Sequence, residues 1–242
     1  MTFRFGKRAA ARSVLAAAAC AALVATGAGP AEAATRQGWI GPTLPSNGTV
    51  FLHYSTVSNT PLYAETRVYS QLGTVVPAHD IGVQSRLFKS GVMCRINDYK
   101  YNSAPTNSFT DRTSGDCGTG SYNSHGFVSV WNGSTYVTYP TFPTDPLNFT
   151  APAARSSSSA LADVRAESGR NARGQTYGSG VDNENVPDLI ASIGTNGQVG
   201  YVKKSDLPKP ASNRDAATNR SPRQVQLYDK DGVTVKGTFR IN

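Results

Sequence analysis

The sequence has little charge and few cysteines, and no long hydrophobic run follows its first 30 residues. Charged residues make up 17% of the 242 positions, below the roughly 25% that is usual for soluble domains. No segment has the pattern of a long amphipathic helix. These deficits exclude a coiled coil, an acidic disordered chain and a collagen-like repeat. The 23 Gly and 14 Pro favour a loop-rich β protein.

The N-terminus has the three parts of a secretory signal peptide. Four basic residues within positions 4–12 precede the apolar run 14–24, and Ala31-Glu-Ala33 forms a cleavage site of the A-x-A type. The apolar run is too short for a transmembrane helix, which needs about 20 residues. We therefore expect residues 1–33 to be removed and the mature protein to be secreted, with no transmembrane span.

The charge balance of the mature chain is mildly basic. Of the 24 basic and 16 acidic residues in the full chain, 20 and 15 remain after residue 33. No block of five or six like charges marks a nucleic-acid-binding arm, so we expect no nucleic-acid partner. A cationic exported protein is attracted to anionic cell-wall polymers, although the same charge is also explained by solubility alone.

Two cysteines are left in the mature chain. Cys20 lies in the predicted signal peptide, which leaves Cys94 and Cys117. An even cysteine count in an oxidising compartment predicts one disulfide. In the chain-entropy model, closing a loop of this size stabilises the fold by about 3 kcal/mol.

The mature chain divides at a stretch of small and polar residues. Residues 151–160 contain four consecutive serines and no hydrophobic period, as is typical of a linker. Before the linker, residues 35–150 show frequent short strand signals, which predict a small antiparallel β-sandwich or barrel that carries the disulfide. After it, residues 161–242 predict a second small, β-rich domain.

One predicted hairpin in the first domain carries an aromatic face. Its turn signal is Asn132-Gly133, and a two-residue loop fixes the register of the flanking strands. Phe127, Trp131 and Tyr136 then share one face. If that face is exposed, it is an aromatic platform for sugars or a partner protein. Burial of both faces of the hairpin explains the pattern as well, and we favour burial.

A second predicted hairpin suggests an anion site. A two-residue turn at Ser90-Gly91 places Arg86 opposite Arg95, where like charges repel each other. A bound anion between the two guanidinium groups removes this cost. An ordinary ion pair with Glu65 or Asp98 removes it too and is the simpler interpretation.

Two resemblances to known proteins are local. Residues 187–207, and within them Asn196-Gly-Gln-Val-Gly-Tyr-Val-Lys-Lys-Ser-Asp-Leu207, resemble the closing strand of bacterial SH3-like modules, which implies peptidoglycan binding. The usual opening of these modules is matched only loosely by Asp163-Val-Arg-Ala-Glu-Ser-Gly169. The whole layout, including Tyr228-Asp-Lys-Asp-Gly232, resembles a group of secreted actinomycete two-domain β proteins, and this resemblance implies no activity.

The sequence contains no motif of a known catalytic or metal site. Zinc, P-loop, dinucleotide and nucleophile-elbow motifs are all missing, so we expect no catalytic residue, metal or cofactor. The three histidines are His53, His79 and His125. His79 is followed by Asp80, but adjacent strand residues point to opposite faces, which argues against a pair that hydrogen bonds side by side.

Three function classes fit these observations. We favour a secreted, non-enzymatic protein that binds a cell-wall polysaccharide, peptidoglycan or a secreted protein. The alternatives are a secreted toxin or enzyme inhibitor, which requires a rigid protruding loop, and a hydrolase, which requires His, Ser and a carboxylate in one cleft. The candidate binding residues are Phe127, Trp131, Tyr136, Arg86 and Arg95.

Overall fold

The computed structural model describes residues 33–152, 164–182 and 185–242. These residues belong to one compact unit, Ala31–Asn242, and they form strands and one short 3-10 turn, η3 (Lys204–Asp206). The chain is therefore mainly β, as predicted. The predicted signal peptide, apart from Ala33, and most of the predicted linker lie outside the described residues.

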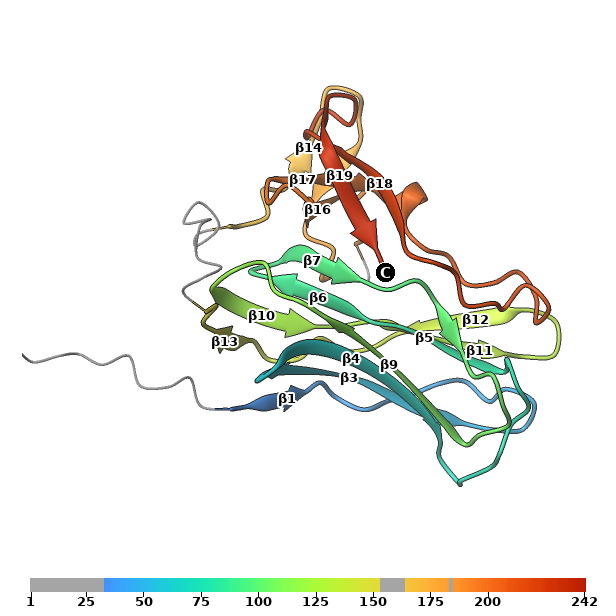
Figure 1. Cartoon of the computed structure of the whole chain (residues 1–242). Helices are drawn as coiled ribbons and strands as arrows, with labels where there is room; N and C mark the ends of the chain where they lie inside the picture. The colour runs from blue at the N-terminus through green and yellow to red at the C-terminus, as the bar shows by residue number, and fades with distance from the viewer. Residues whose placement is uncertain (1–32, 153–163, 183–184) are drawn as a thin grey trace, which may run out of the picture. The chain divides into compact units, whose positions relative to one another are not determined.

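Three sheets make up the described fold (Figure 1). The first has the order β1-β3-β4-β9, and β2 pairs with β3. Its strands are β1 (Thr35–Gln37), β2 (Gly41–Pro42), β3 (Phe51–Asn59), β4 (Leu62–Ser70) and β9 (Ser108–Ser114). β4 buries every second residue, the alternation expected of a strand with one face toward a core.

The second sheet has four strands in the order β12-β11-β5-β8. It consists of β5 (Ile81–Gln84), β8 (Lys100–Tyr101), β11 (Phe127–Trp131) and β12 (Tyr136–Pro140).

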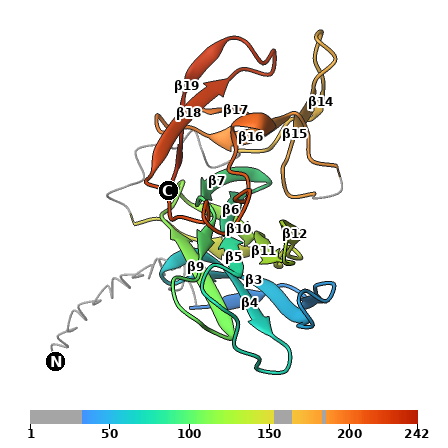
Figure 2. The ribbon, with the colours of Figure 1, turned by 90° about the vertical axis from the view of Figure 1, so that its right-hand side faces the viewer.

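The third sheet joins the regions before and after the predicted linker. Its main order is β13-β10-β6-β7-β16-β17-β18-β19, in which β7 pairs in parallel with β16 at Met93 and Ser192. Figure 2 shows the hairpin of the last two strands at the end of this sheet. The earlier strands are β6 (Arg86–Lys89), β7 (Val92–Ile96), β10 (Gly120–Ser124) and β13 (Leu147–Phe149). The later ones are β14 (Gly169–Arg170), β15 (Thr176–Gly178), β16 (Leu189–Ile193), β17 (Val199–Lys203), β18 (Arg223–Tyr228) and β19 (Val235–Ile241).

The hydrophobic core crosses the same boundary. One buried cluster combines Val57 of the first sheet, Leu87 of β6 and Leu189 of β16. A second cluster combines Phe88 of β6 with Phe239 of β19. The division into residues 35–150 and 161–242 stays a prediction. In the structure, the later segment completes the packing of the earlier one.

The predicted disulfide between Cys94 and Cys117 is confirmed. The bond joins β7 to the segment that follows β9, and its two Cα atoms are 6.1 Å apart. Cys94 is fully buried and belongs to the same cluster as Leu87. The bond therefore holds the segment between β9 and β10 against β7 inside the core.

The predicted pairing of Arg86 with Arg95 is wrong. The Ser90-Gly91 turn sets the register as expected as far as Phe88 and Met93, but a β-bulge follows, so that Arg95 lies opposite Leu87 and Arg86 opposite Ile96. A bulge puts two residues of one strand against one residue of the other, and each one-residue slip exchanges the faces. The two arginines therefore do not face each other.

The predicted two-residue turn at Asn132-Gly133 is also wrong, but the predicted faces are right. The hairpin closes at Trp131 and Tyr136, so its loop has four residues. The Asn132 side chain stabilises this loop by accepting hydrogen bonds from the amides of Ser134 and Thr135. The register moves by an even number of residues, which keeps every side chain on its predicted face.

No described residue belongs to a helix that is long and apolar enough to cross a membrane.

Two buried histidines make the stability of the fold depend on pH. Burial lowers the pKa of His53 from 6.5 to about 4, and burial together with the charge of Arg86 lowers the pKa of His125 well below 6.5. The unfolded chain then binds more protons than the folded one below about pH 6.5, so acid favours unfolding. Since one pKa unit corresponds to about 1.4 kcal/mol, His53 alone accounts for at most about 3 kcal/mol.

We therefore predict that the free energy of unfolding falls steadily between about pH 6.5 and 4.5, as measured by urea denaturation at several pH values. The variant His53→Gln, whose side-chain amide can still donate to the Pro42 carbonyl, should show a flatter profile. A constant free energy across this window in the unmodified protein would contradict the neutral, buried state of both rings.

Candidate binding site at the end of the four-stranded sheet

The three predicted aromatic residues share one face of the four-stranded sheet, but they differ in exposure. Tyr136 is buried, with 8% of its surface exposed, whereas Phe127 and Trp131 are half-buried. The rings of Trp131 and Tyr136 pack edge to face with their centroids 5.2 Å apart, and Tyr101 packs on the other side of Tyr136. The face is a continuous aromatic cluster of which only part reaches the surface.

A segment from the C-terminal region covers most of this cluster. Residues 208–222, which we call the strap, contain no strand and lie between η3 and β18. Ala211 and Ala217 of the strap are buried against the aromatic rings. The amide of Ala211 donates to the Tyr101 hydroxyl at 2.7 Å, and the Tyr101 amide donates to the side chain of Asn219 at 3.3 Å. The strap therefore covers most of the aromatic face, as expected from the interpretation of the sequence that favoured burial of this face.

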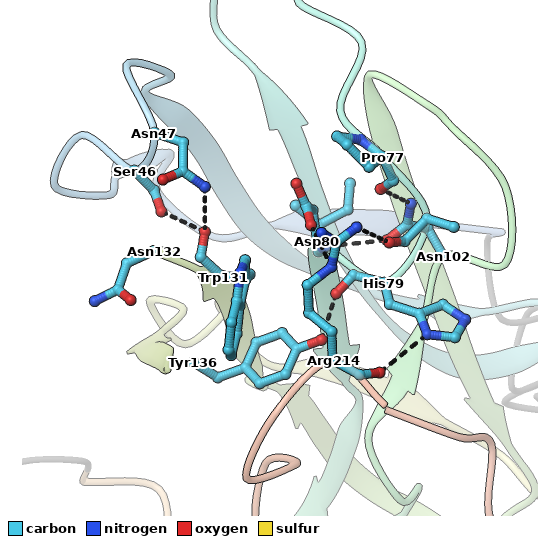
Figure 3. Close-up of polar contacts among 12 residues, drawn as sticks. Ser46, Asn47, Pro77, His79, Asp80, Asn102, Trp131, Asn132, Tyr136 and Arg214 are labelled. Atoms are coloured by element: carbon cyan, nitrogen blue, oxygen red, sulfur yellow. Dashed lines mark hydrogen bonds and ion pairs between the residues drawn. The ribbon is translucent and has the colours of Figure 1, made fainter. Parts of the chain in front are cut away.

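An ion pair fixes the centre of the strap beside Trp131 (Figure 3). The Nε of Arg214 lies 3.0 Å from Oδ1 of Asp80, and its Nη2 donates to the Ala78 carbonyl at 2.8 Å. The Arg214 carbonyl lies 3.2 Å from Nδ1 of His79. Because a carbonyl only accepts, Nδ1 carries the proton in this contact. Arg214 is thus held at both ends.

The turn before β5 presents Asp80 to this arginine. His79 has φ 66°, a left-handed conformation that is uncommon for a residue other than glycine. The Tyr136 hydroxyl donates to the His79 carbonyl, and the Asn102 amide donates to the Pro77 carbonyl at 2.8 Å. These hydrogen bonds fix the turn to Tyr136, in β12, and to Asn102, directly after β8.

The Asp80 carboxylate is largely shielded from solvent. Only 7% of the residue is exposed. Burial raises the pKa of Asp80, and the positive charges of Arg214 and His79 oppose this rise. Arg214 keeps 39% of its side chain exposed, so the pair presents its guanidinium side to solvent.

Trp131, Asp80 and Arg214 line a pocket of about 480 Å³. Ser46, Asn47 and Thr49 also line it, and the Ser46 hydroxyl donates to the Trp131 carbonyl at 2.7 Å. The lining thus combines two aromatic residues, Phe51 and Trp131, with one charged pair and several hydroxyl-bearing residues. This is the composition of a small-molecule site in which a few polar groups orient a ligand on an apolar wall.

The ionisable side chains that line this pocket are one carboxylate and one guanidinium. Asp80 is the only carboxylate among the residues that line the pocket, and its partner is a guanidinium and not an imidazole. The Ser46 hydroxyl is engaged with a backbone carbonyl and has no base beside it. Among the described residues no group of three or more His, Cys, Asp or Glu is arranged to hold a metal ion.

The two predicted arginines lie elsewhere. Arg86 is 2% exposed; its Nη2 donates to Nδ1 of His125 at 2.8 Å, and its guanidinium lies 4.1 Å from the Phe127 ring centre. Burial lowers the pKa of Arg86 to about 9. Arg95 donates to the carbonyls of Cys94 and Asp116 at 2.9 Å each. Both guanidinium groups therefore hold the interior and the disulfide region together.

Sequence reasoning missed Arg214 and two exposed aromatic residues, Trp39 and Phe142. Nothing in the polar, proline-flanked strap indicates that its arginine reaches the turn before β5. Trp39 is 82% exposed and Phe142 is 51% exposed. Their Gly- and Pro-rich surroundings lack the alternation that made Trp131 visible. Asp80 was noticed in the sequence, but only as a neighbour of His79.

Comparisons with protein-family models, curated proteins and solved structures find no match to this chain.

We predict that Asp80 and Arg214 are energetically coupled. Arg214→Gln leaves a buried carboxylate without its ion pair and should destabilise the protein by about 1–2 kcal/mol, since an unpaired buried charge is costly. The double variant with Asp80→Asn should be less destabilised than the sum of the two single variants. Urea denaturation at pH 7 measures all three, and strictly additive effects would contradict the coupling.

Proposed function

We propose that this protein is an exported, non-enzymatic binding protein whose pocket at Trp131 binds a cell-wall polysaccharide. The observation that carries this proposal is that the partly exposed Trp131 and the Asp80–Arg214 ion pair line one pocket. A sugar ring has an apolar face of C–H groups and a rim of hydroxyls. It therefore matches a site that has an aromatic wall and charged hydrogen-bonding groups.

Each lining residue has a role in this proposal. Trp131 supplies the surface on which a sugar ring stacks. The exposed side of Arg214 donates hydrogen bonds to sugar hydroxyls, and the Asp80 carboxylate keeps the guanidinium in its orientation at 3.0 Å. Tyr136 supports the Trp131 ring through an edge-to-face contact. Because these groups are fixed before binding, little ordering is needed when the ligand enters.

The non-enzymatic part of the proposal rests on the number of carboxylates. Most glycoside hydrolases use two carboxyl groups that flank the scissile bond. The pocket offers Asp80 alone, and that carboxylate is paired with Arg214. This arrangement supports binding of the sugar without cleavage of a glycosidic bond.

Export and the cell-wall context complete the proposal. A predicted signal peptide over residues 1–33 and the disulfide Cys94–Cys117 are consistent with an oxidising compartment. The resemblance of residues 187–207 to SH3-like modules favours peptidoglycan among the cell-wall polymers. The mild positive charge adds a general attraction that salt weakens.

Binding to insoluble cell walls in a pull-down assay tests the proposal. In about 1 M NaCl the screening length is about 3 Å, so attraction due to net charge is suppressed while stacking on Trp131 persists. Trp131→Ala should then weaken binding by about tenfold, the effect of about 1.4 kcal/mol. Arg214→Gln should weaken it as well.

Trp39→Ala is the matched control, because the chain has two tryptophans and Trp39 lies outside the lining of the pocket. It should bind as the unmodified protein does. Equal binding by Trp131→Ala, or loss of binding only in Trp39→Ala, would overturn the assignment to this pocket. Release of soluble sugar from the cell walls would replace the binding function with an enzymatic one.

A further inference from the structure

Three lysines surround a second pocket, away from Trp131. Lys203, at the end of β17, Lys204, in η3, and Lys209, in the strap, line a hollow of about 400 Å³. Gln175, Asp188 and Ser205 complete the lining. The lining therefore includes three lysines and one acidic residue.

The positions of these lysines are constrained by the fold. The Lys203 ammonium lies 4.2 Å from the ring centre of Tyr228, a cation–π contact that directs its side chain. The Lys204 amide donates to the Asp188 carbonyl at 2.8 Å, which fixes the start of η3. Lys209 lies between Pro208 and Pro210, and each proline restricts the backbone around it. The backbone thus places the three lysines around one hollow.

The single carboxylate of the pocket does not balance these charges. Oδ2 of Asp188 accepts hydrogen bonds from the amide and the hydroxyl of Thr176, at 2.9 and 3.0 Å. These bonds and the nearby charge of Lys204 lower the pKa of Asp188, so the carboxylate is ionised. The neighbouring Asp206 accepts the Ser205 hydroxyl and does not line the pocket. No ion pair among the residues that the structure describes involves any of the three lysines.

The donor set identifies the kind of anion. Each ammonium group has three donors and no acceptor, and lysine binds phosphate as a point charge. The Gln175 side-chain amide adds a neutral donor. A phosphate group carries several oxygens that accept from different directions, whereas a single carboxylate presents only two. A lining with three lysines and one amide fits phosphate better.

We propose that the pocket formed by Lys203, Lys204 and Lys209 binds phosphate groups. This site is independent of the sugar pocket: the two share no lining residue. The phosphate is either free or part of a phosphodiester polymer. A second basic hollow of about 300 Å³ favours the polymer: Arg170, Arg173 and Lys230 line it together with Asp231. Lys230 also pairs with Glu167 at 3.4 Å, so the basic residues of this hollow still outnumber the acidic ones. The Asn171 side chain contacts both Gln175 and the Lys230 carbonyl, so it links the two surfaces.

The experiment measures saturable binding at constant ionic strength. The full mature chain is titrated with inorganic phosphate, with pyrophosphate and with a short glycerol phosphodiester oligomer, while NaCl keeps the ionic strength fixed. Isothermal calorimetry gives the affinity, and amide chemical shifts of residues 203–209 locate the site. We expect saturation with all three probes and the largest shifts in this segment.

A pair of matched variants separates a site from general attraction. Lys204→Gln with Lys209→Gln should weaken binding by about tenfold or more, because two charges that converge on the anion are lost. Lys100→Gln with Lys236→Gln removes the same charge at two positions that line neither this pocket nor the hollow at Lys230, and it should change the affinity for each probe by less than about twofold. Circular dichroism and thermal unfolding establish that both variants are folded.

The outcomes decide the proposal. Equal weakening in both pairs, or no saturation by any probe, would overturn it. Much tighter binding of the oligomer than of inorganic phosphate identifies a phosphodiester polymer as the source, and similar affinities identify free phosphate. None of these results depends on Trp131, so the proposal can fail while sugar binding holds, and the reverse is also true.

Discussion

The pairing of β7 with β16 is the contact on which the rest of the fold depends. β7 carries Cys94 and forms the edge of the strands that precede the linker region. An exposed strand edge is prone to pair with other chains. Here Ser192 of β16 pairs with Met93 and brings β17, β18 and β19 into the same sheet. The buried clusters are completed by residues from both sides, and the strap is carried to the aromatic face. The pocket at Trp131 therefore receives Arg214 from the C-terminal segment that covers this edge.

Most strands could be predicted from the sequence because their signals are local. The sequence predicts strands at Leu62–Ser70 and Phe127–Trp131, and these are the bounds of β4 and β11. The two hairpins show where local reasoning reaches its limit. The loop after Trp131 has two more residues than predicted. Because side chains alternate between the two faces of a strand, a shift of two residues leaves each aromatic side chain on its predicted face. The bulge opposite Leu87 adds one residue, and the predicted pair of arginines is lost. Because of the bulge, Cys94 has no paired residue on β6, and Cys94 is the residue that forms the disulfide.

The candidate site was predicted in part, for a related reason. The hairpin pattern identified Trp131 and Tyr136 as neighbours on one face, and the structure places them 5.2 Å apart. The pattern could not show that Tyr136 is buried, because its cover comes from Ala211 and Ala217 in a segment with no periodicity. Arg214 was invisible for the same reason: its role depends on a long-range contact with Asp80. The lysine pocket likewise joins residues of a strand, a 3-10 turn and the strap.

The strap connects two strands that are themselves neighbours. β17 and β18 pair through Tyr201 and Tyr228, so the strap is an enlarged hairpin loop whose ends are fixed by the sheet. Its attachments to the four-stranded sheet are made by side chains such as Tyr101, Asn219 and Arg214, and not by a strand ladder. Its release exposes the aromatic cluster but breaks no pairing between strands. The energy of that opening is set locally and lies below that of global unfolding. The segment that covers the aromatic face can therefore exchange its amide hydrogens while the core beneath the third sheet remains closed.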